Sequence, residues 1–245
     1  VVSGPTGSGK STSLYAALKE IKSERTNITT VEDPVEYQLD GVNQVQVFED
    51  IGLTFGSTLR SILRQDPDVL LIGEIRDGET ADIAVKFALT GHLVFSTVHA
   101  NDAPGTITRL LDIGIAPFLV GSCLNLVMAQ RLVRRICKNC KTEYTPTNEE
   151  LALVGLDSNK VSGPLYKGEG CAECRNTGYK GRLAIFEMIP MARDLRKLVF
   201  DNANEDEIRT ASLNNGMTTL REAGLARVLD GTTSIQEILR STVED

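Results

Sequence analysis

One glycine-rich stretch constrains the fold of this chain more than any other segment. Gly4-Pro5-Thr6-Gly7-Ser8-Gly9-Lys10-Ser11 fits the pattern G-x-x-x-x-G-K-[ST], in which backbone N–H groups wrap an anionic phosphate chain. Val1-Val2-Ser3 is typical of the end of a buried strand, and residues 12–21 have the apolar spacing of a helix. A strand, this loop and a helix in succession predict an α/β fold with a phosphate site at the helix N-terminus.

The loop pattern assigns roles to individual residues. We expect Lys10 to contact the β- and γ-phosphates and the hydroxyl of Ser11 to ligate Mg²⁺. A chance glycine-rich turn is disfavoured by the flanking strand and helix. The predicted nucleotide-binding residues are Gly4, Thr6, Gly7, Ser8, Gly9, Lys10, Ser11 and Thr12.

Carboxylates gather where a second strand ends. The β-branched run 28–31 predicts this strand, and Pro34 stops it among Glu32, Asp33 and Glu36. Ligands of open α/β sheets bind at the carboxyl ends of the strands, so these acids are candidates to hold Mg²⁺ or orient a water. A solvated acidic loop is the alternative. The strand end favours Glu32 as the base, with Glu36 left open.

A third strand, 69–72, is apolar throughout and leads into Gly73-Glu74-Ile75-Arg76-Asp77. This segment is similar to a Walker B motif, except that glycine stands where many such motifs carry an aspartate. The acidic role therefore passes to Glu74, and Arg76 is a candidate partner for a carboxylate or phosphate. A helix predicted over 56–65 offers Arg60 and Arg64 as further cations.

The two histidines flank a fourth predicted strand, 93–98, which follows a helix over 79–89. His99 stands at the carboxyl end of this strand and is a candidate for phosphate sensing or a subunit contact. His92, at the other end, is as well explained by a structural role. Alternating strands and helices predict a mostly parallel, RecA-like sheet, with further helices over 102–111 and 118–132.

Four of the five cysteines form Cys137-x-x-Cys140 and Cys171-x-x-Cys174. Paired knuckles of this spacing predict a tetrahedral Zn²⁺ site of four thiolates, structural because a closed shell leaves no position for water. A redox role is disfavoured, because the motif occurs twice without a thioredoxin-like context. Cys123 is predicted to be an inert core thiol.

Composition limits the function classes. A net charge of −7 gives no general attraction to nucleic acid, although Arg131, Arg134, Arg135, Lys138 and Lys141 are candidates for a local basic patch. We expect no membrane span and a cytoplasmic chain. The predicted domains are a RecA-like core (1–133), a tetracysteine zinc module (134–185) and a C-terminal helical subdomain (186–245). Because the chain begins inside the loop strand, we also expect an N-terminal partner domain.

Taken together, these motifs resemble the secretion-ATPase superfamily, in particular the assembly ATPases of type IV pili and type II secretion. The resemblance covers essentially the whole chain. It rests on the phosphate loop, an Asp box at 30–37, a Walker B region at 63–77 that includes Gly73, a His box at 90–99 and the four cysteines. The cysteines match assembly ATPases and not the retraction ATPases.

The resemblance implies a homohexameric, ATP-hydrolysing motor with catalytic sites at subunit interfaces. It would act peripherally at the bacterial inner membrane on a platform protein that assembles pilins or pseudopilins, without nucleic acid. The implied cofactors are ATP, Mg²⁺ and Zn²⁺. The implied catalytic residues are Glu32 for the attacking water, Glu74 for the Mg²⁺ and water network, His99 near the γ-phosphate with His92 nearby, and Arg76 for charge stabilisation.

Two other readings remain open. Some nucleoside monophosphate kinases also combine a phosphate loop with a Cys₄ zinc lid, but the long segment 141–170 between the knuckles fits such a compact lid poorly. A nucleic-acid motor is disfavoured by the acidic charge and by an aromatic content of 5%. A GTPase is disfavoured because the sequence lacks an N-K-x-D motif.

Overall fold

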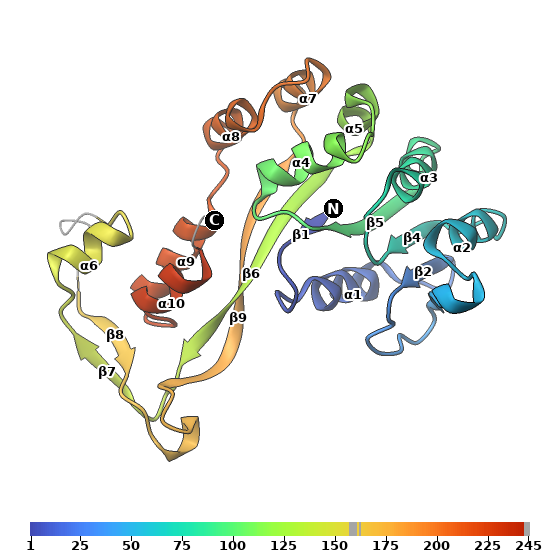
Figure 1. Ribbon diagram of the computed structural model, residues 1–245. Coiled ribbons are helices and arrows are strands. Elements are labelled where there is room, and N and C mark those ends of the chain that lie inside the picture. Colours follow the sequence, from blue (N-terminus) through green and yellow to red (C-terminus); the bar gives the residue numbers. More distant parts are fainter. Residues whose placement is uncertain (157–160, 162, 243–245) are drawn as a thin grey trace. The chain divides into compact units, whose positions relative to one another are not determined.

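The computed structural model describes residues 1–156, 161 and 163–242 (Figure 1). The chain divides into two compact units. The first unit comprises Val1–Ala129 and Met188–Met217, and the second comprises Gln130–Glu187 and Thr218–Asp245. The C-terminal helices are consequently shared between the two units.

The first unit contains most of a parallel sheet and the helices that pack on it. Its elements are β1 (Val2–Ser3), α1 (Lys10–Ile21), β2 (Ile28–Glu32), β3 (Asn43–Gln46), η1 (Glu49–Ile51), α2 (Phe55–Ile62), β4 (Val69–Ile72), α3 (Gly78–Leu89), β5 (Leu93–Val98), α4 (Ala103–Asp112), α5 (Pro117–Cys123), α7 (Arg193–Phe200) and α8 (Glu205–Asn214).

The sheet has the order β3-β2-β4-β5-β1-β6-β9, in which β6 is Leu126–Ile136 and β9 is Tyr179–Pro190. The registers Thr30↔Leu71 and Leu71↔Phe95 join β2, β4 and β5 in parallel, and β1 is parallel to both β5 and β6. The predicted α/β architecture with a mostly parallel sheet is confirmed. Because these strands are parallel, the residues that follow β1, β2, β4 and β5 meet at one edge of the sheet.

Packing of α1 against the sheet fixes the position of the glycine-rich loop. Leu14, Tyr15 and Leu18 of α1 are buried in one apolar cluster with Ile28 and Leu71 of the neighbouring strands. Burying each such apolar side chain stabilises the fold by about 1.5–3 kcal/mol. The start of α1, and with it the end of the loop, is therefore anchored to the sheet.

The second unit is smaller and is built around a hairpin. Its elements are β7 (Lys141–Tyr144), α6 (Asn148–Leu153), β8 (Leu165–Gly168), η3 (Ala172–Cys174), α9 (Leu220–Leu229) and α10 (Ile235–Ser241). β7 and β8 are antiparallel, with Lys141 opposite Gly168. A Cβ on Gly168 would lie 2.0 Å from the carbonyl oxygen of Gly178, so this approach of two backbone segments requires glycine.

The predicted helix over 118–132 is wrong beyond its first turns. α5 ends at Cys123, and the chain continues as the strand β6 (Leu126–Ile136). Val127, Ala129 and Val133 are buried on one face of this strand. An apolar run of this kind does not distinguish a buried strand from a buried helix.

The strand predicted over 183–186 is the middle of a much longer one, β9 (Tyr179–Pro190). β6 and β9 each contribute residues to both units. The strands β3, β7 and β8 and the helix α6 were not predicted, because each is short and mostly polar.

Candidate functional site

The glycine-rich loop connects β1 to α1 in the predicted way. Gly7 and Gly9 have φ angles of 78° and 87°, in the left-handed region that favours glycine, and Gly9 is the N-cap residue of α1. The ammonium of Lys10 donates to the carbonyl oxygens of Gly4 (2.7 Å) and Pro5 (3.2 Å). The Lys10 side chain therefore lies along the loop that a phosphate chain would enter.

Glu32, at the end of β2, points into the protein. Its side chain is buried and accepts hydrogen bonds from the hydroxyls of Tyr15 and Thr30 and from Nε2 of Gln44, the last two at 2.5 and 3.3 Å. Burial and the hydrogen bond to Glu32 raise the pKa of Tyr15 well above its ordinary value. Tyr15 therefore remains a neutral donor, and its hydrogen bond to Glu32 joins α1 to β2.

Glu36, four residues later, lies on the solvent side of the same segment. It is exposed, and its Oε1 accepts from the hydroxyl of Ser11 at 3.5 Å. Of the two Asp-box glutamates, the structure thus brings Glu36 to the residue expected to ligate Mg²⁺.

Glu36 is held there by the segment around it. Gln44 Nε2 also donates to the Tyr37 carbonyl at 3.2 Å, and Gln44 Oε1 accepts from Leu39 N at 2.6 Å. The Tyr15 and Tyr37 rings meet edge-on with centroids 4.8 Å apart. The network around the buried Glu32 therefore positions the loop that carries Glu36.

Glu74 is the centre of a second polar cluster at the same edge. It pairs with the guanidinium of Arg76, and its Oε2 lies 3.3 Å from Nε2 of His99. Only 12% of the Glu74 side chain is exposed, against 53% for His99. The hydrogen bond to Glu74 raises the pKa of Arg76. The predicted residues Glu74, Arg76 and His99 are thus brought together after β4 and β5.

Packing explains the glycine that departs from the usual Walker B pattern. A Cβ at Gly73 would lie 3.2 Å from both the Glu32 Cα and the Val31 carbonyl oxygen. The Gly73 N–H donates to that same carbonyl at 2.7 Å. β2 and β4 therefore leave little room for a side chain at this position, and the acidic group comes one residue later.

His92 does not lie near His99, so this part of the prediction is wrong. The whole of β5 separates the two histidines, which places His92 at the opposite edge of the sheet. Its ring stacks on Phe87 with centroids 4.1 Å apart, and Nδ1 lies 2.9 Å from the Thr90 hydroxyl. These contacts give His92 a structural role in the turn between α3 and β5.

The other arginine candidates lie on α2 and after it. Arg60 pairs with Glu79 of α3. Arg64 follows the end of α2 and is exposed.

The four knuckle cysteines converge in the second unit. Their sulfur atoms all lie within 4.8 Å of one another, with Sγ–Sγ distances of 3.9 Å for Cys137–Cys171, 3.8 Å for Cys140–Cys174 and 3.7 Å for Cys171–Cys174. A regular tetrahedron of thiolates with Zn–S bonds of about 2.3 Å has edges of about 3.8 Å. The donor set and its spacing fit a zinc ion.

Backbone N–H groups also support the thiolate state. Burial raises the pKa of the Cys174 thiol, but hydrogen bonds from the N–H groups of Cys171 and Gly178 and from the Cys171 and Cys140 thiols lower it, whereas burial and the neighbouring thiols raise the pKa of Cys140. Cys123 is half-buried at the end of α5, and burial raises its pKa. Its predicted inertness agrees with that direction.

Sequence reasoning missed Tyr15, Thr30 and Gln44 as partners of Glu32. The contact between Thr30 and Glu32 could have been predicted, because residues i and i+2 of a strand share a face. For Tyr15, the sequence shows only the helical spacing of a core residue, which does not indicate a contact with Glu32. Among the described residues, no helix is long and apolar enough to cross a membrane.

A family model described as "Type II/IV secretion system protein" matches residues 1–240. The chain belongs to this family. Over 247 residues it is 49% identical to the type IV pilus assembly ATPase PilB of Myxococcus xanthus, covering 100% of this chain and 44% of the relative. It is 47% identical to type II secretion system protein E of Pseudomonas aeruginosa, covering 100% and 48%. The chain thus spans less than half the length of these curated secretion-family relatives.

Solved structures agree with this family assignment. The crystal structure of the pilus retraction motor PilT with bound ADP superposes with a TM-score of 0.72 at 27% identity, covering 100% of this chain and 60% of that one. The Legionella pneumophila ATPase DotB shares the fold at a TM-score of 0.68 and 21% identity. The predicted secretion-ATPase family and RecA-like fold are therefore confirmed.

Proposed function

We propose that this chain is the catalytic part of a motor that hydrolyses ATP with Mg²⁺ to drive pilin or pseudopilin assembly, in type IV pilus biogenesis or type II secretion. The observation that carries the proposal is the convergence of the Lys10–Ser11 loop, Glu36 and the Glu74–Arg76–His99 cluster at one edge of a parallel sheet. The relatives named as pilus assembly ATPases and secretion proteins support it.

The loop would bind the nucleotide, with Lys10 exchanging its carbonyl partners for β- and γ-phosphate oxygens. The further binding residues would be Gly4, Thr6, Gly7, Ser8, Gly9, Ser11 and Thr12. Mg²⁺, when bound, would neutralise charge that develops on the phosphates. The Ser11 hydroxyl would hold it, and its position beside Glu36 places a carboxylate within reach of the same ion or its waters.

Two glutamates are candidates for the group that activates the attacking water. The sequence favours Glu32, whereas exposure and proximity to Ser11 favour Glu36. We propose Glu36 as the group that orients or deprotonates the water, and Glu32 as a positioning residue held by Tyr15. Glu74 would hold the Mg²⁺ and water network, oriented by Arg76 and His99.

The four cysteines would hold a structural Zn²⁺ that fixes the two knuckles of the second unit. By analogy with the family, the complete protein would be a homohexamer with nucleotide sites at subunit interfaces. It would work peripherally at the cytoplasmic face of the bacterial inner membrane, with a platform protein of the pilus or secretion machine as its partner.

The proposal is tested by release of inorganic phosphate from MgATP at increasing protein concentration, together with the mass from light scattering. A specific activity that rises with concentration as hexamers form supports a ring motor. The variant Lys10→Ala should lose nucleotide binding, whereas Lys19→Ala, a lysine of the same helix outside the loop, should keep it. AMP-dependent phosphate transfer without release of inorganic phosphate would instead identify a nucleotide kinase.

A further inference from the structure

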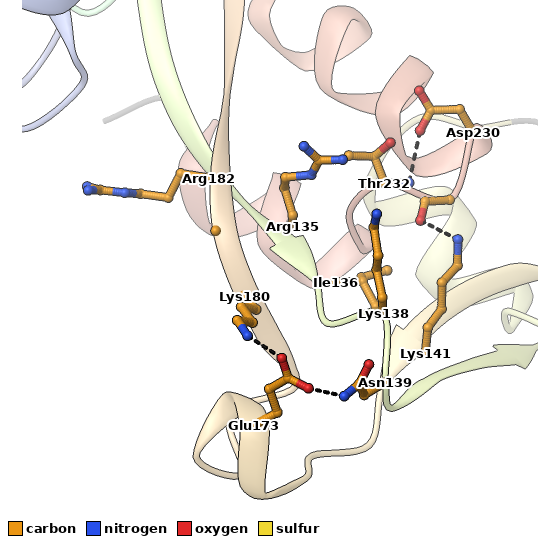
Figure 2. Close-up of a pocket in the computed structure, with 12 residues that line it drawn as sticks. Arg135, Ile136, Lys138, Asn139, Lys141, Glu173, Lys180, Arg182, Asp230 and Thr232 are labelled. Carbon is orange, nitrogen blue, oxygen red and sulfur yellow. Dashed lines mark hydrogen bonds and ion pairs between the residues drawn. The ribbon is translucent and has the colours of Figure 1, made fainter.

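A basic cavity lies within the second unit. It has a volume of about 500 Å³. Its polar lining comes from the end of β6, both knuckles, β7, the start of β9 and the turn between α9 and α10 (Figure 2). Its charged side chains are five basic and two acidic: Arg135, Lys138, Lys141, Lys180, Arg182, Glu173 and Asp230.

Both acids of this cavity are already engaged. Glu173 pairs with Lys180 and accepts from Asn139. Asp230 accepts from the Arg227 guanidinium at 3.0 Å and from the Thr232 N–H at 2.9 Å. Neither carboxylate is therefore available to neutralise the remaining cations.

Three basic residues have no hydrogen-bonded or ionic side-chain partner within the described ranges: Arg135, Lys138 and Arg182. A fourth, Lys141, donates to the Gly231 carbonyl at 2.7 Å and lies 3.9 Å from the Tyr166 ring centroid, but it has no carboxylate partner among the described residues. In Figure 2 the Arg135 and Lys138 head groups lie on the side of Thr232, whereas Arg182 extends away. Arg135, Lys138 and Lys141 are thus the cations best placed to share one ligand.

The four neighbouring thiolates do not explain why all of these basic side chains gather in the cavity. A zinc ion with four thiolates carries a formal charge of about −2, which attracts nearby cations. The hydrogen bond to Glu173 and, more weakly, the charges of Cys137 and Cys171 raise the pKa of Lys180, so this lysine is already engaged. Arg135 projects from β6 before the first knuckle, and Lys141 is turned towards Gly231.

We propose that this cavity binds a phosphate group through Arg135, Lys138 and Lys141. A guanidinium offers paired donors that match phosphate oxygens, and ammonium groups add point charges. A phosphate ester carries more charge and more acceptor oxygens than a carboxylate, so it satisfies three cations at once. The volume lies within the range of small-ligand pockets, roughly 300–1,000 Å³. The phosphate would belong to a soluble phosphoester or to a lipid headgroup.

The test measures binding of inorganic pyrophosphate by calorimetry to the zinc-loaded protein carrying Lys10→Ala, so that the nucleotide loop does not contribute. We expect saturable binding that weakens as salt rises. Adding Arg135→Gln and Lys138→Gln should weaken it about tenfold or more, because each charge-assisted hydrogen bond contributes about a factor of ten. The matched control Lys167→Gln, on β8 outside the cavity, should change it less than about twofold.

Zinc content and thermal unfolding of each variant establish that the second unit remains folded. Competition by phosphatidylglycerol vesicles, but not by phosphatidylcholine vesicles, would assign the site to a lipid headgroup. Pyrophosphate binding without vesicle competition would assign it to a soluble phosphoester. Absence of saturable pyrophosphate binding, or equal affinity in the double variant and the control, would overturn the proposal.

Discussion

The hydroxyl of Ser11 donates to Glu36 Oε1 across 3.5 Å and so joins the phosphate loop to the Asp box. Glu32, at the start of the same box, is buried against Tyr15 and Thr30. The two acids therefore lie in different environments, although only three residues separate them in the sequence. Their environments predict different effects of the same substitution.

Replacement of Glu36 by Gln should lower kcat about 10²–10⁴-fold while ATP binding persists, because a general base is lost and the binding loop is retained. Glu32→Gln should chiefly lower the melting temperature. The measurements are phosphate release, nucleotide affinity and thermal unfolding for both variants. A Glu32→Gln protein with unchanged stability but no turnover would restore Glu32 as the base.

Tyr15→Phe removes one donor to the buried Glu32 carboxylate and should cost about 1–3 kcal/mol of stability. The Glu36 loop should become less well positioned, so kcat should fall more than nucleotide affinity. Tyr144→Phe, a substitution of the same kind in the second unit, is the control. If kcat and KM were unchanged in a stable Tyr15→Phe protein, the positioning role of Tyr15 would be excluded.

Gly73→Ala should destabilise the first unit by about 1–3 kcal/mol, because its Cβ would lie 3.2 Å from the β2 backbone. Denaturant unfolding measures this cost. Gly163→Ala is the matched control, because nothing lies within 4 Å of a Cβ at that position. Equal stability of both variants would show that β2 and β4 move apart easily.

Cys137→Ser should release zinc and lower the thermal stability of the second unit, because metal binding and folding of such a module are coupled. Metal analysis and thermal unfolding report these two effects. Cys123→Ser, outside the cluster, should retain the metal. An unchanged metal content in Cys137→Ser would rule out the four-thiolate site.

Glu237 should make the second unit sensitive to acid. Burial raises the pKa of this carboxyl, but hydrogen bonds from Arg240 and Arg134 outweigh burial and bring it to about 2. Because the folded pKa lies below the ordinary value of 4.5, the stabilisation is complete above about pH 4.5. It is lost as the pH falls towards 2, and amounts to about 3 kcal/mol at neutral pH.

Hydrogen exchange of the Arg134 N–H, which donates to Glu237 at 2.8 Å, follows this effect locally. Glu237→Gln should accelerate the exchange at pH 7 and have little effect at pH 2. Glu169→Gln, an exposed glutamate of the same unit, serves as the control. Acceleration of the same size at both pH values would contradict the ionic origin.

The sequence predicted the loop and the parallel core strands, and it named Glu74, Arg76 and His99 as candidate site residues, because these follow from local pattern and strand polarity. It favoured Glu32 as the base and left Glu36 open. The burial of Glu32 could not be predicted, because Tyr15 and Gln44 are distant along the chain and reach Glu32 only after packing. The strand β6 was missed because its apolar run also fits a buried helix. His92 was misplaced because a strand is extended, so two histidines that flank the same strand lie at opposite edges of the sheet.

The chain passes between its two units inside β6, near the end of β9 and again after Met217. Neither unit is therefore a continuous segment of sequence. A continuous segment that contains the cysteine module and extends to the C-terminus also takes α7 and α8 from the first unit. A continuous segment that stops before α7 leaves α9 and α10 of the second unit behind. Evolutionary exchange of either unit by simple recombination would be hindered for the same reason, so the two units are expected to be inherited together.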